Sequence, residues 1–166
     1  MIIRPASIDD AAQMTAMLND IIAAGGTTAH QTPFDVDRMI AHYVACPTGI
    51  CCHVADNQGQ VLGFQQLDGP DPDQSGDAGW GYIASFVKTS ASGAGIGQKL
   101  FAETLKQAKR AGVRHINATI RADNTVGLRY YHGLGFVTID RQIGVPLTDG
   151  TPVDRVVTRY DLQPPS

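Results

Sequence analysis

The chain has 166 residues, of which 43% are hydrophobic and 17% are charged, and its formal net charge is −3. This composition is typical of a globular protein and excludes a wholly disordered chain, while the small negative charge argues against a nucleic-acid partner, which would favour a basic face. The length suits one domain with a packed core, and we expect that domain to span residues 1–166.

The cysteines and the apolar runs exclude further classes. Three cysteines occur, Cys46, Cys51 and Cys52, with no C-x-x-C pair and no Cys–His cluster at zinc-ligand spacing. Residues 1–5 lack the apolar core of a signal peptide, and no apolar run approaches the roughly 20 residues that a membrane span needs. We therefore expect a cytoplasmic protein with no metal ion and no membrane partner.

Periodicity and turn residues predict the elements of the first half. Ser7 is a good N-cap, Asp10 lies at the capping-box position, and apolar residues then recur at helical spacing up to Gly25-Gly26. The run Asp56-Asn57-Gln58-Gly59 predicts a hairpin turn. The expected elements are a short strand at 2–3, a helix over 7–24, a helix over about 35–46, and strands at 50–55 and 61–67.

The second half begins with a surface loop over 68–77, whose four aspartates do not have the spacing of a calcium-binding loop. A capping residue, Asp123 or Asn124, then starts a short helix that ends near His132. The other expected elements are a strand at 79–87, a helix at 95–111, and strands at 115–120, 136–145 and 153–162. The order β-α-α-β-β-β-α-β-α-β-β predicts a mixed α/β domain.

The most informative segment is the loop between the strand ending at Val87 and the next helix, Ser92-Gly93-Ala94-Gly95-Ile96-Gly97. Alternating glycines at a helix start leave free backbone N–H groups at the positive end of the helix dipole, which is a way of holding phosphate. The loop lacks the Gly-Lys-Ser/Thr ending of a Walker loop and the early βαβ setting of a dinucleotide fingerprint. Taken alone, it indicates either a phosphate cradle or tight packing at a turn.

A second motif lies about thirty residues downstream, where Asn124 precedes Tyr131 and the pair Gly135-Phe136. Together the two motifs resemble the GNAT superfamily of acetyl-CoA-dependent N-acetyltransferases: the loop matches [QR]-x-x-G-x-[GA] except at Ser92, and N-x(6)-Y-x(3)-G-F matches in full. Residues 18–20 and 27–34 are also similar to the phosphinothricin acetyltransferase branch, whose members often carry His in place of Tyr131. The resemblance implies a central, mostly antiparallel mixed sheet of about seven strands flanked by about four helices.

The resemblance also implies roles for residues around acetyl-CoA, the expected co-substrate. The strand backbone near Phe86 would pair with the pantetheine arm, the loop amides would hold the pyrophosphate, and Tyr131 would reach the sulfur and assist the departing thiolate. Asn124 would contact the pantetheine or order the loop nearby. The implied cofactor-binding residues are Phe86, Val87, Lys88, Ser92, Gly93, Ala94, Gly95, Ile96, Gly97, Gln98, Asn124 and Tyr131, and Tyr131 is also the catalytic candidate.

Departures from the family pattern bear on affinity and on the general base. Ser92 replaces the usual Arg or Gln, which predicts weaker cofactor binding through the remaining backbone amides. The central strands carry no Glu, and their polar options are Trp80, Tyr82, Ser85, His115, Asn117 and Thr119. His30 titrates in the useful range and would face the acceptor pocket, whose other expected lining residues are Phe34, Trp80 and Tyr82.

The sequence therefore favours an enzyme that transfers acetyl from acetyl-CoA to a primary amine of a small molecule. Direct attack in a ternary complex is expected, because no cysteine lies at the motifs to serve as a nucleophile. Two alternatives stay open: acetylation of a peptide or protein N-terminus, and a catalytically silent acyl-CoA-binding sensor. A homodimer is also expected, because the last hairpin often borders a dimer interface in related folds.

Overall fold

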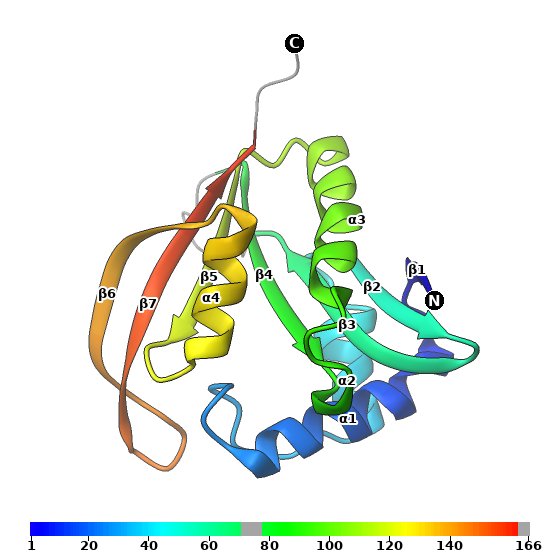
Figure 1. Cartoon of the computed structure of the whole chain (residues 1–166), viewed down its shortest axis with the longest axis horizontal. Helices are drawn as coiled ribbons and strands as arrows, with labels where there is room; N and C mark the ends of the chain where they lie inside the picture. The colour runs from blue at the N-terminus through cyan, green and yellow to red at the C-terminus, as the bar shows by residue number, and fades with distance from the viewer. Residues whose placement is uncertain (71–77, 163–166) are drawn as a thin grey trace.

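The computed structural model describes residues 1–70 and 78–162. Within them one sheet has seven strands in the order β1-β2-β3-β4-β5-β7-β6 (Figure 1). The strands are β1 (Ile2–Pro5), β2 (Gly49–Asn57), β3 (Gln60–Asp68), β4 (Trp80–Val87), β5 (His115–Arg121), β6 (Val137–Pro146) and β7 (Pro152–Asp161). The helices are α1 (Ala11–Ala24), α2 (Val36–Met39), α3 (Ile96–Arg110) and α4 (Thr125–Leu134). Most of the loop expected over 68–77 lies outside the described residues.

The expected order of strands and helices is confirmed, and so is the mixed, mostly antiparallel sheet: among the strands that the structure describes, only β4 and β5 pair in parallel. The helix caps predicted from the sequence form at the expected residues. Ser7 and Asp10 form a capping box before α1, and the Asn124 side chain accepts from the amide of Gly127 at the start of α4. The helix expected over 35–46 is shorter, since α2 passes into a π-helical turn, η2 (Ile40–Val44). The pattern of apolar residues does not distinguish the wider spacing of such a turn from that of an α-helix.

Helices cover both faces of the sheet, and the alternating side chains of β3 show which helices lie on each face. Phe64 packs with α1 and η2 in one core cluster, whereas its neighbour Gln65 bonds to Thr104 of α3 and Tyr130 of α4. We call these two sides the α1 face and the α3 face. The core is therefore double, because successive residues of the central strands supply apolar side chains to opposite layers.

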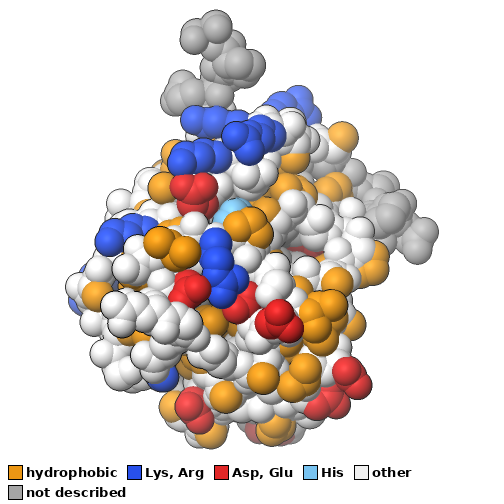
Figure 2. Space-filling model, turned by 90° about the vertical axis from the view of Figure 1, so that its right-hand side faces the viewer, with side chains coloured by type: hydrophobic (Ala, Val, Ile, Leu, Met, Phe, Trp, Pro, Cys, Tyr) orange, Lys and Arg blue, Asp and Glu red, His pale blue; other side chains and the backbone are white. Residues whose placement is uncertain are grey.

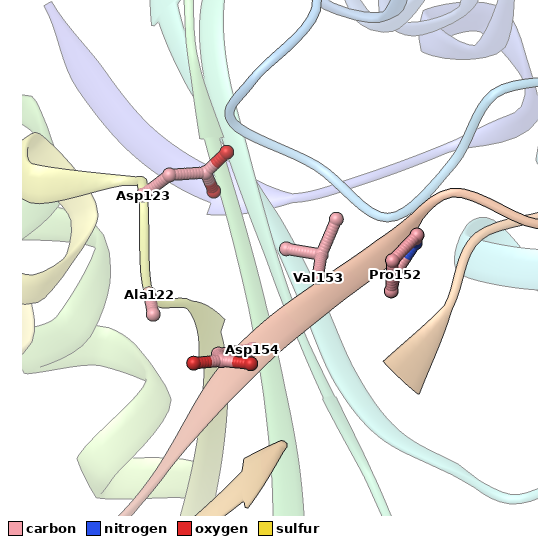
Figure 3. A pocket seen from close by; sticks show the side chains of 5 residues that line it. All are labelled: Ala122, Asp123, Pro152, Val153 and Asp154. Carbon is pink, nitrogen blue, oxygen red and sulfur yellow. The ribbon is translucent and has the colours of Figure 1, made fainter. Parts of the chain in front are cut away.

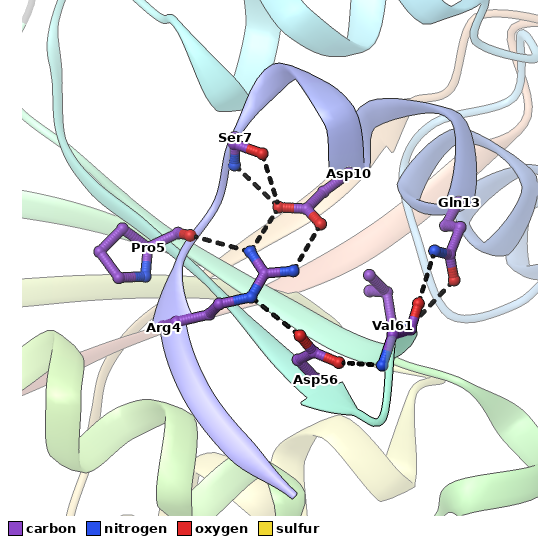
Figure 4. Close-up of polar contacts among 8 residues, drawn as sticks. Arg4, Pro5, Ser7, Asp10, Gln13, Asp56 and Val61 are labelled. Carbon is purple, nitrogen blue, oxygen red and sulfur yellow. Dashed lines mark hydrogen bonds and ion pairs between the residues drawn. The ribbon is translucent and has the colours of Figure 1, made fainter.

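An ion-pair cluster ties the first strand to the α1 face (Figure 4). The Arg4 guanidinium donates to both oxygens of Asp10 at 2.8 Å and to Asp56 at 3.0 Å. Asp10 also accepts from the Ser7 amide, so it joins β1 to the start of α1. These bonds to Arg4 lower the pKa of both carboxyl groups. Both stay ionised at neutral pH and fix the edge of the sheet.

The sheet opens between its two parallel strands. β4 and β5 pair only at Trp80–His115, Gly81–Ile116 and Tyr82–Asn117. Beyond these pairs, residues 83–87 of β4 remain paired with β3 alone, and residues 118–121 of β5 remain paired with β7 alone. The two halves of the sheet therefore diverge and leave a gap that reaches from one face to the other.

The surface carries mixed charge. On the side shown in Figure 2, Lys and Arg side chains gather toward one end, and Asp and Glu lie mainly toward the other. Within residues 1–70 and 78–162, no helix combines the length and the apolar character that crossing a membrane requires.

Candidate functional site

A cavity of about 230 Å³ occupies the gap between β4 and β5. Its walls come from the loop over 27–30, the diverging ends of β4 and β5, the start and middle of α4, and β7. The lining residues are Thr27, Thr28, Ala29, His30, Tyr43, Ile83, Ala84, Ser85, Phe86, Thr119, Ile120, Arg121, Asn124, Tyr131 and Arg155. The cavity thus joins side chains of both faces, since Tyr131 belongs to the α3 face and Tyr43 to the α1 face.

A buried polar network presents Tyr131 to this cavity. The Tyr131 hydroxyl donates to Ser85 Oγ at 2.8 Å, and Ser85 Oγ also accepts from Gln65 Nε2 at 2.8 Å. Gln65 is 0% exposed and accepts from Thr104 at 2.6 Å. Burial raises the pKa of Tyr131, so its phenol keeps its proton at neutral pH. Ser85 Oγ therefore accepts a hydrogen bond from each of these two side chains.

The glycine loop forms the open N-terminus that the sequence predicts. Gly95 caps α3 in the left-handed region at φ 76°, and the first helical bond runs from the Lys99 amide to the Gly95 carbonyl. The amides of residues 96–98 therefore have no partner within the helix. This arrangement can hold an anionic group, as a pyrophosphate requires.

Gly97 has a different reason to be glycine. A Cβ there would lie 2.5 Å from Cε1 of Tyr130, whose hydroxyl donates to the Gly97 carbonyl at 2.8 Å. The same hydroxyl accepts from Gln65 Nε2 at 3.0 Å. The glycine loop and the Tyr131 network are therefore linked through Tyr130 and Gln65.

The edge of β4 offers backbone groups to the gap. The Lys88 amide donates to the Leu62 carbonyl of β3 at 2.8 Å. In an antiparallel ladder alternate residues bond to the same neighbour, so Phe86 also turns its backbone toward β3. Ser85 and Val87 turn theirs toward the gap. An extended ligand could add to this edge as a further strand would, and the Val87 amide could donate to an oxyanion.

The loop over 27–30 closes the α1 side of the cavity, and two tethers hold it while a third holds the adjacent Gln31. Asn124 Nδ2 donates to the Thr27 carbonyl at 3.1 Å, and Arg121 Nη1 donates to the Thr28 carbonyl at 3.1 Å. Gln31 Oε1 accepts from the Asp149 amide at 2.8 Å. Asn124 thus orders the neighbouring loop while its Oδ1 caps α4.

His30 is the imidazole in the cavity wall. Its Nε2 lies 2.8 Å from the Tyr43 hydroxyl, and its ring packs edge-on against Phe34 at 5.0 Å between centroids. Burial, together with the positive charges of His42 and Arg38, lowers the pKa of His30 to about 4. His30 is therefore neutral at pH 7, and the expectation that it titrates in the useful range is wrong, because burial and the two neighbouring positive charges disfavour its protonated form.

The structure separates the four residues expected in the acceptor pocket. His30 lines the cavity, whereas Phe34 is 4% exposed and supports His30 from the core. Trp80 stacks on His115, and Tyr82 is 41% exposed, both where β4 and β5 still pair. Among the residues expected to bind the cofactor, Phe86, Asn124 and Tyr131 line the cavity, while Lys88 and 92–98 lie on the loop and helix beyond β4.

Sequence reasoning did not select Gln65, Arg121 or Arg155. Gln65 is a polar residue inside an apolar strand, and Arg155 interrupts the run Val153-Asp154-Arg155-Val156-Val157 in the same way. Such interruptions are signals, because an ionisable residue in a half-buried strand needs a partner. Whether these side chains reach the same site depends on the register between the strands, which the sequence does not show.

A shallower hollow lies beside the cavity and is lined by Ala122, Asp123, Pro152, Val153 and Asp154 (Figure 3). Its two carboxylates already have partners: Asp123 pairs with Arg121 at 2.8 Å, and Asp154 pairs with Arg141 at 3.1 Å. Among residues 1–70 and 78–162, no group of three or more His, Cys, Asp or Glu is arranged to hold a metal ion.

Solved structures with the same fold include acetyltransferases. A Salmonella typhimurium protein given as a candidate acetyltransferase and solved with its cofactor acetyl-CoA matches with a TM-score of 0.83 and 23% identity, over 98% of this chain and 94% of that one. A protein given as a candidate phosphinothricin N-acetyltransferase matches with a TM-score of 0.80 and 22% identity, over 98% and 99% of the two chains. These likenesses show that the chain shares the overall fold of these proteins.

The family model for the acetyltransferase (GNAT) family matches residues 15–136, which include the glycine loop and the motif from Asn124 to Phe136. The chain therefore belongs to the GNAT acetyltransferase family, as its motifs indicated. It is an acetyltransferase. A curated relative is the L-methionine sulfoximine/L-methionine sulfone acetyltransferase of Salmonella typhimurium, which is 27% identical over 151 residues, covering 87% of this chain and 86% of the relative.

Proposed function

We propose that the protein acetylates the primary amine of a small molecule by direct attack on acetyl-CoA within a ternary complex. The observation that carries this proposal is the cavity between β4 and β5, which brings the Tyr131–Ser85 pair and the loop over 27–30 to one space. The similarity to an acetyltransferase of methionine sulfoximine and methionine sulfone supports an acceptor of that size.

The donor would be held by backbone groups along β4 and at the start of α3. The unpartnered amides of 96–98 suit the pyrophosphate, and the gap-facing edge at Ser85 and Val87 suits the pantetheine amides. Lys88 and the exposed Ser92, Gly93 and Ala94 lie between these two segments. In this arrangement Ser92 supplies only a short hydroxyl where the family has a long side chain.

The chemistry needs a neutral amine, a stabilised oxyanion and a proton for the leaving sulfur. His30, which stays neutral at pH 7, would accept a hydrogen bond from the attacking amine, and water would carry away the proton that the amine loses. The Val87 amide would donate to the oxyanion as the C–N bond forms. Tyr131, still protonated at neutral pH, would donate as the C–S bond breaks, with Ser85 orienting or relaying that proton.

A covalent acetyl-enzyme has little support. The cavity lining contains no cysteine, and burial raises the pKa of Cys51 to about 11 and of Cys52 to about 12. Thiols with such values carry almost no thiolate at pH 7 and are poor nucleophiles.

The test combines calorimetric titration with acetyl-CoA and a thiol-release assay over small amines and short peptides with free N-termini. Binding with release on small amines is the expected result. Release on peptides alone would favour the N-terminal acetyltransferase, and binding without release on any amine would favour the silent acyl-CoA sensor. An absence of binding would refute the donor assignment.

The compartment and assembly are further proposals. Three free cysteines suit the reducing cytoplasm. The edge strand β6 exposes Val137, Ile139 and Ile143 at 53%, 44% and 73%, which supports a homodimer through the last hairpin. Light scattering of the purified protein measures this mass directly, and a monomeric mass at micromolar concentration would refute the dimer.

A further inference from the structure

Two arginines face each other across neighbouring strands in the wall of the cavity. Arg121 at the end of β5 is the register partner of Arg155 on β7, and both line the cavity. Directly opposed side chains on adjacent antiparallel strands lie about 4.5–5.5 Å apart at Cβ, and like charges in such a pair repel. A pair of this kind calls for compensating negative charge.

Only one of the two guanidinium groups has that compensation. Arg121 donates through Nε and Nη2 to the two oxygens of Asp123, at 2.9 and 2.8 Å, and through Nη1 to the Thr28 carbonyl. Arg155 forms no ion pair among the described residues, and its buried Nε has no hydrogen-bond partner there. A buried guanidinium N–H without a partner is costly, so this group is poised to bind an acceptor oxygen.

Among residues 1–70 and 78–162, the cavity wall offers nothing to neutralise Arg155. The fifteen lining residues from this part of the chain include two arginines and no Asp or Glu. The nearby Asp154 precedes Arg155 on the strand and bonds to Arg141 and the Gly144 amide, in the neighbouring hollow. The cavity therefore has an excess of positive charge beside the Tyr131–Ser85 pair, where the amine must react.

We propose that Arg155, with Arg121 beside it, binds a carboxylate of the acceptor, so that the substrates are amino acids or analogues that keep a free carboxylate. This proposal rests on the proposed function and adds the group that selects the acceptor. A planar carboxylate matches the guanidinium fork with two parallel hydrogen bonds, and a buried site strengthens both. The carboxylate is not consumed: nitrogen replaces sulfur on the acetyl carbon, and the product is the N-acetyl amino acid.

The test compares matched acceptors on matched variants. L-Methionine sulfone and 3-(methylsulfonyl)propylamine differ by one carboxylate, and further amino acids are paired with their decarboxylated amines in the same way. Wild type, Arg155→Met, Arg155→Lys and Arg159→Met are assayed for kcat/KM on every pair. Arg159 is the control, because it lies on the same face of β7 four residues along but outside the cavity lining.

We expect the wild type to prefer the carboxylated member of at least one pair. Arg155→Met should lower kcat/KM for that acceptor by about 10- to 100-fold, as the loss of charge-assisted hydrogen bonds implies, and should leave its decarboxylated partner within about 3-fold. Arg155→Lys should fall between, since it keeps the charge and loses the fork. Equal activity on both members of every pair, or equal sensitivity of both to Arg155→Met, would overturn the proposal.

A binding measurement separates this proposal from the proposed function. L-Methionine sulfone is titrated calorimetrically into wild type and Arg155→Met, each saturated with CoA. If no amine is acetylated, the proposed function fails, yet carboxylate-dependent binding that the variant loses would still support the anion site. An equal heat of binding in both proteins, or no heat of binding in either, would count against the anion site. Arg155→Met should retain or raise Tm, because it removes a repulsive pair.

Discussion

Replacing Tyr131 by phenylalanine removes one oxygen from the cavity wall and leaves the packing intact. The ring still contacts Phe136 at 5.1 Å and Tyr130 at 4.8 Å between centroids. Ser85 Oγ keeps the donation from Gln65, so no acceptor is left without a partner. The stability cost should therefore be about 1 kcal/mol or less, the net value of one intramolecular hydrogen bond.

The effect on turnover should be far larger than the effect on stability. If Tyr131 donates a proton to the leaving sulfur, its loss should lower kcat by roughly 10²- to 10⁴-fold, or about 3–5 kcal/mol of transition-state stabilisation. The affinity for CoA should change little, because the glycine loop and the β4 edge remain. Steady-state kinetics at saturating acetyl-CoA, with calorimetric titration of CoA, measures the two quantities separately.

Tyr130→Phe is the matched control for this prediction. It removes a neighbouring hydroxyl that bonds to the Gly97 carbonyl and to Gln65 and that does not line the cavity. We expect it to weaken CoA binding through the loop and to leave kcat within about tenfold, because it removes no proton donor at the reacting atoms. A fall in kcat of less than about threefold for Tyr131→Phe, or an equal fall for both variants, would remove Tyr131 from the chemistry.

Three further predictions concern the loop, the cap and pH. Gly97→Ala should destabilise the protein by about 1–3 kcal/mol, because the added Cβ would overpack against Tyr130. In thermal unfolding, the double variant with Tyr130→Ala should lose less stability than the sum of the two single variants, and simple additivity would contradict the clash. Asn124→Ala should cost about 1 kcal/mol from the lost cap and raise the acceptor KM by freeing Thr27, and an unchanged KM would show that the tether is dispensable. His30 has a folded-state pKa of about 4, below its unfolded value near 6.5, so the unfolded chain binds more protons between these values. Stability should therefore fall as pH drops from about 6.5 to about 4, and His30→Gln should reduce the slope of unfolding free energy against pH in that range. Part of the slope should remain, because burial also lowers the pKa of His42 and of His53.

Much of the fold could be predicted because its signals are local. The capping residues Ser7 and Asn124, the glycines at the start of α3 and the turn at residues 56–59 each act within a few residues. Such signals place elements in order along the chain. The π-helical turn at Ile40–Val44 was not predicted, because a single wide turn leaves the apolar pattern nearly unchanged.

The site was predictable only in part, for a physical reason. Tyr131 and the glycine loop belong to contiguous motifs that a single sequence displays. The bonds that connect them are not visible in a contiguous motif: Gln65 lies 65 residues before Tyr130, its partner, and the pairing of β3 with β4 sets it opposite Ser85. The opposition of Arg121 and Arg155 likewise depends on antiparallel register, and a one-residue slip would turn Arg155 to the other face.

Strand alternation also bears on the order of the chemistry. Along β4, Ser85 contacts Tyr131 on the α3 face, and Phe86 packs with Tyr43 on the α1 face. In a closed sheet these two sets of side chains would never meet, because the paired backbone separates them. Since β4 and β5 pair only at their first residues, the cavity admits both sets at once. A donor held along the α3 face and an acceptor held by the loop over 27–30 would then meet through the gap without exchanging places, which favours direct transfer over a relay through an acylated side chain.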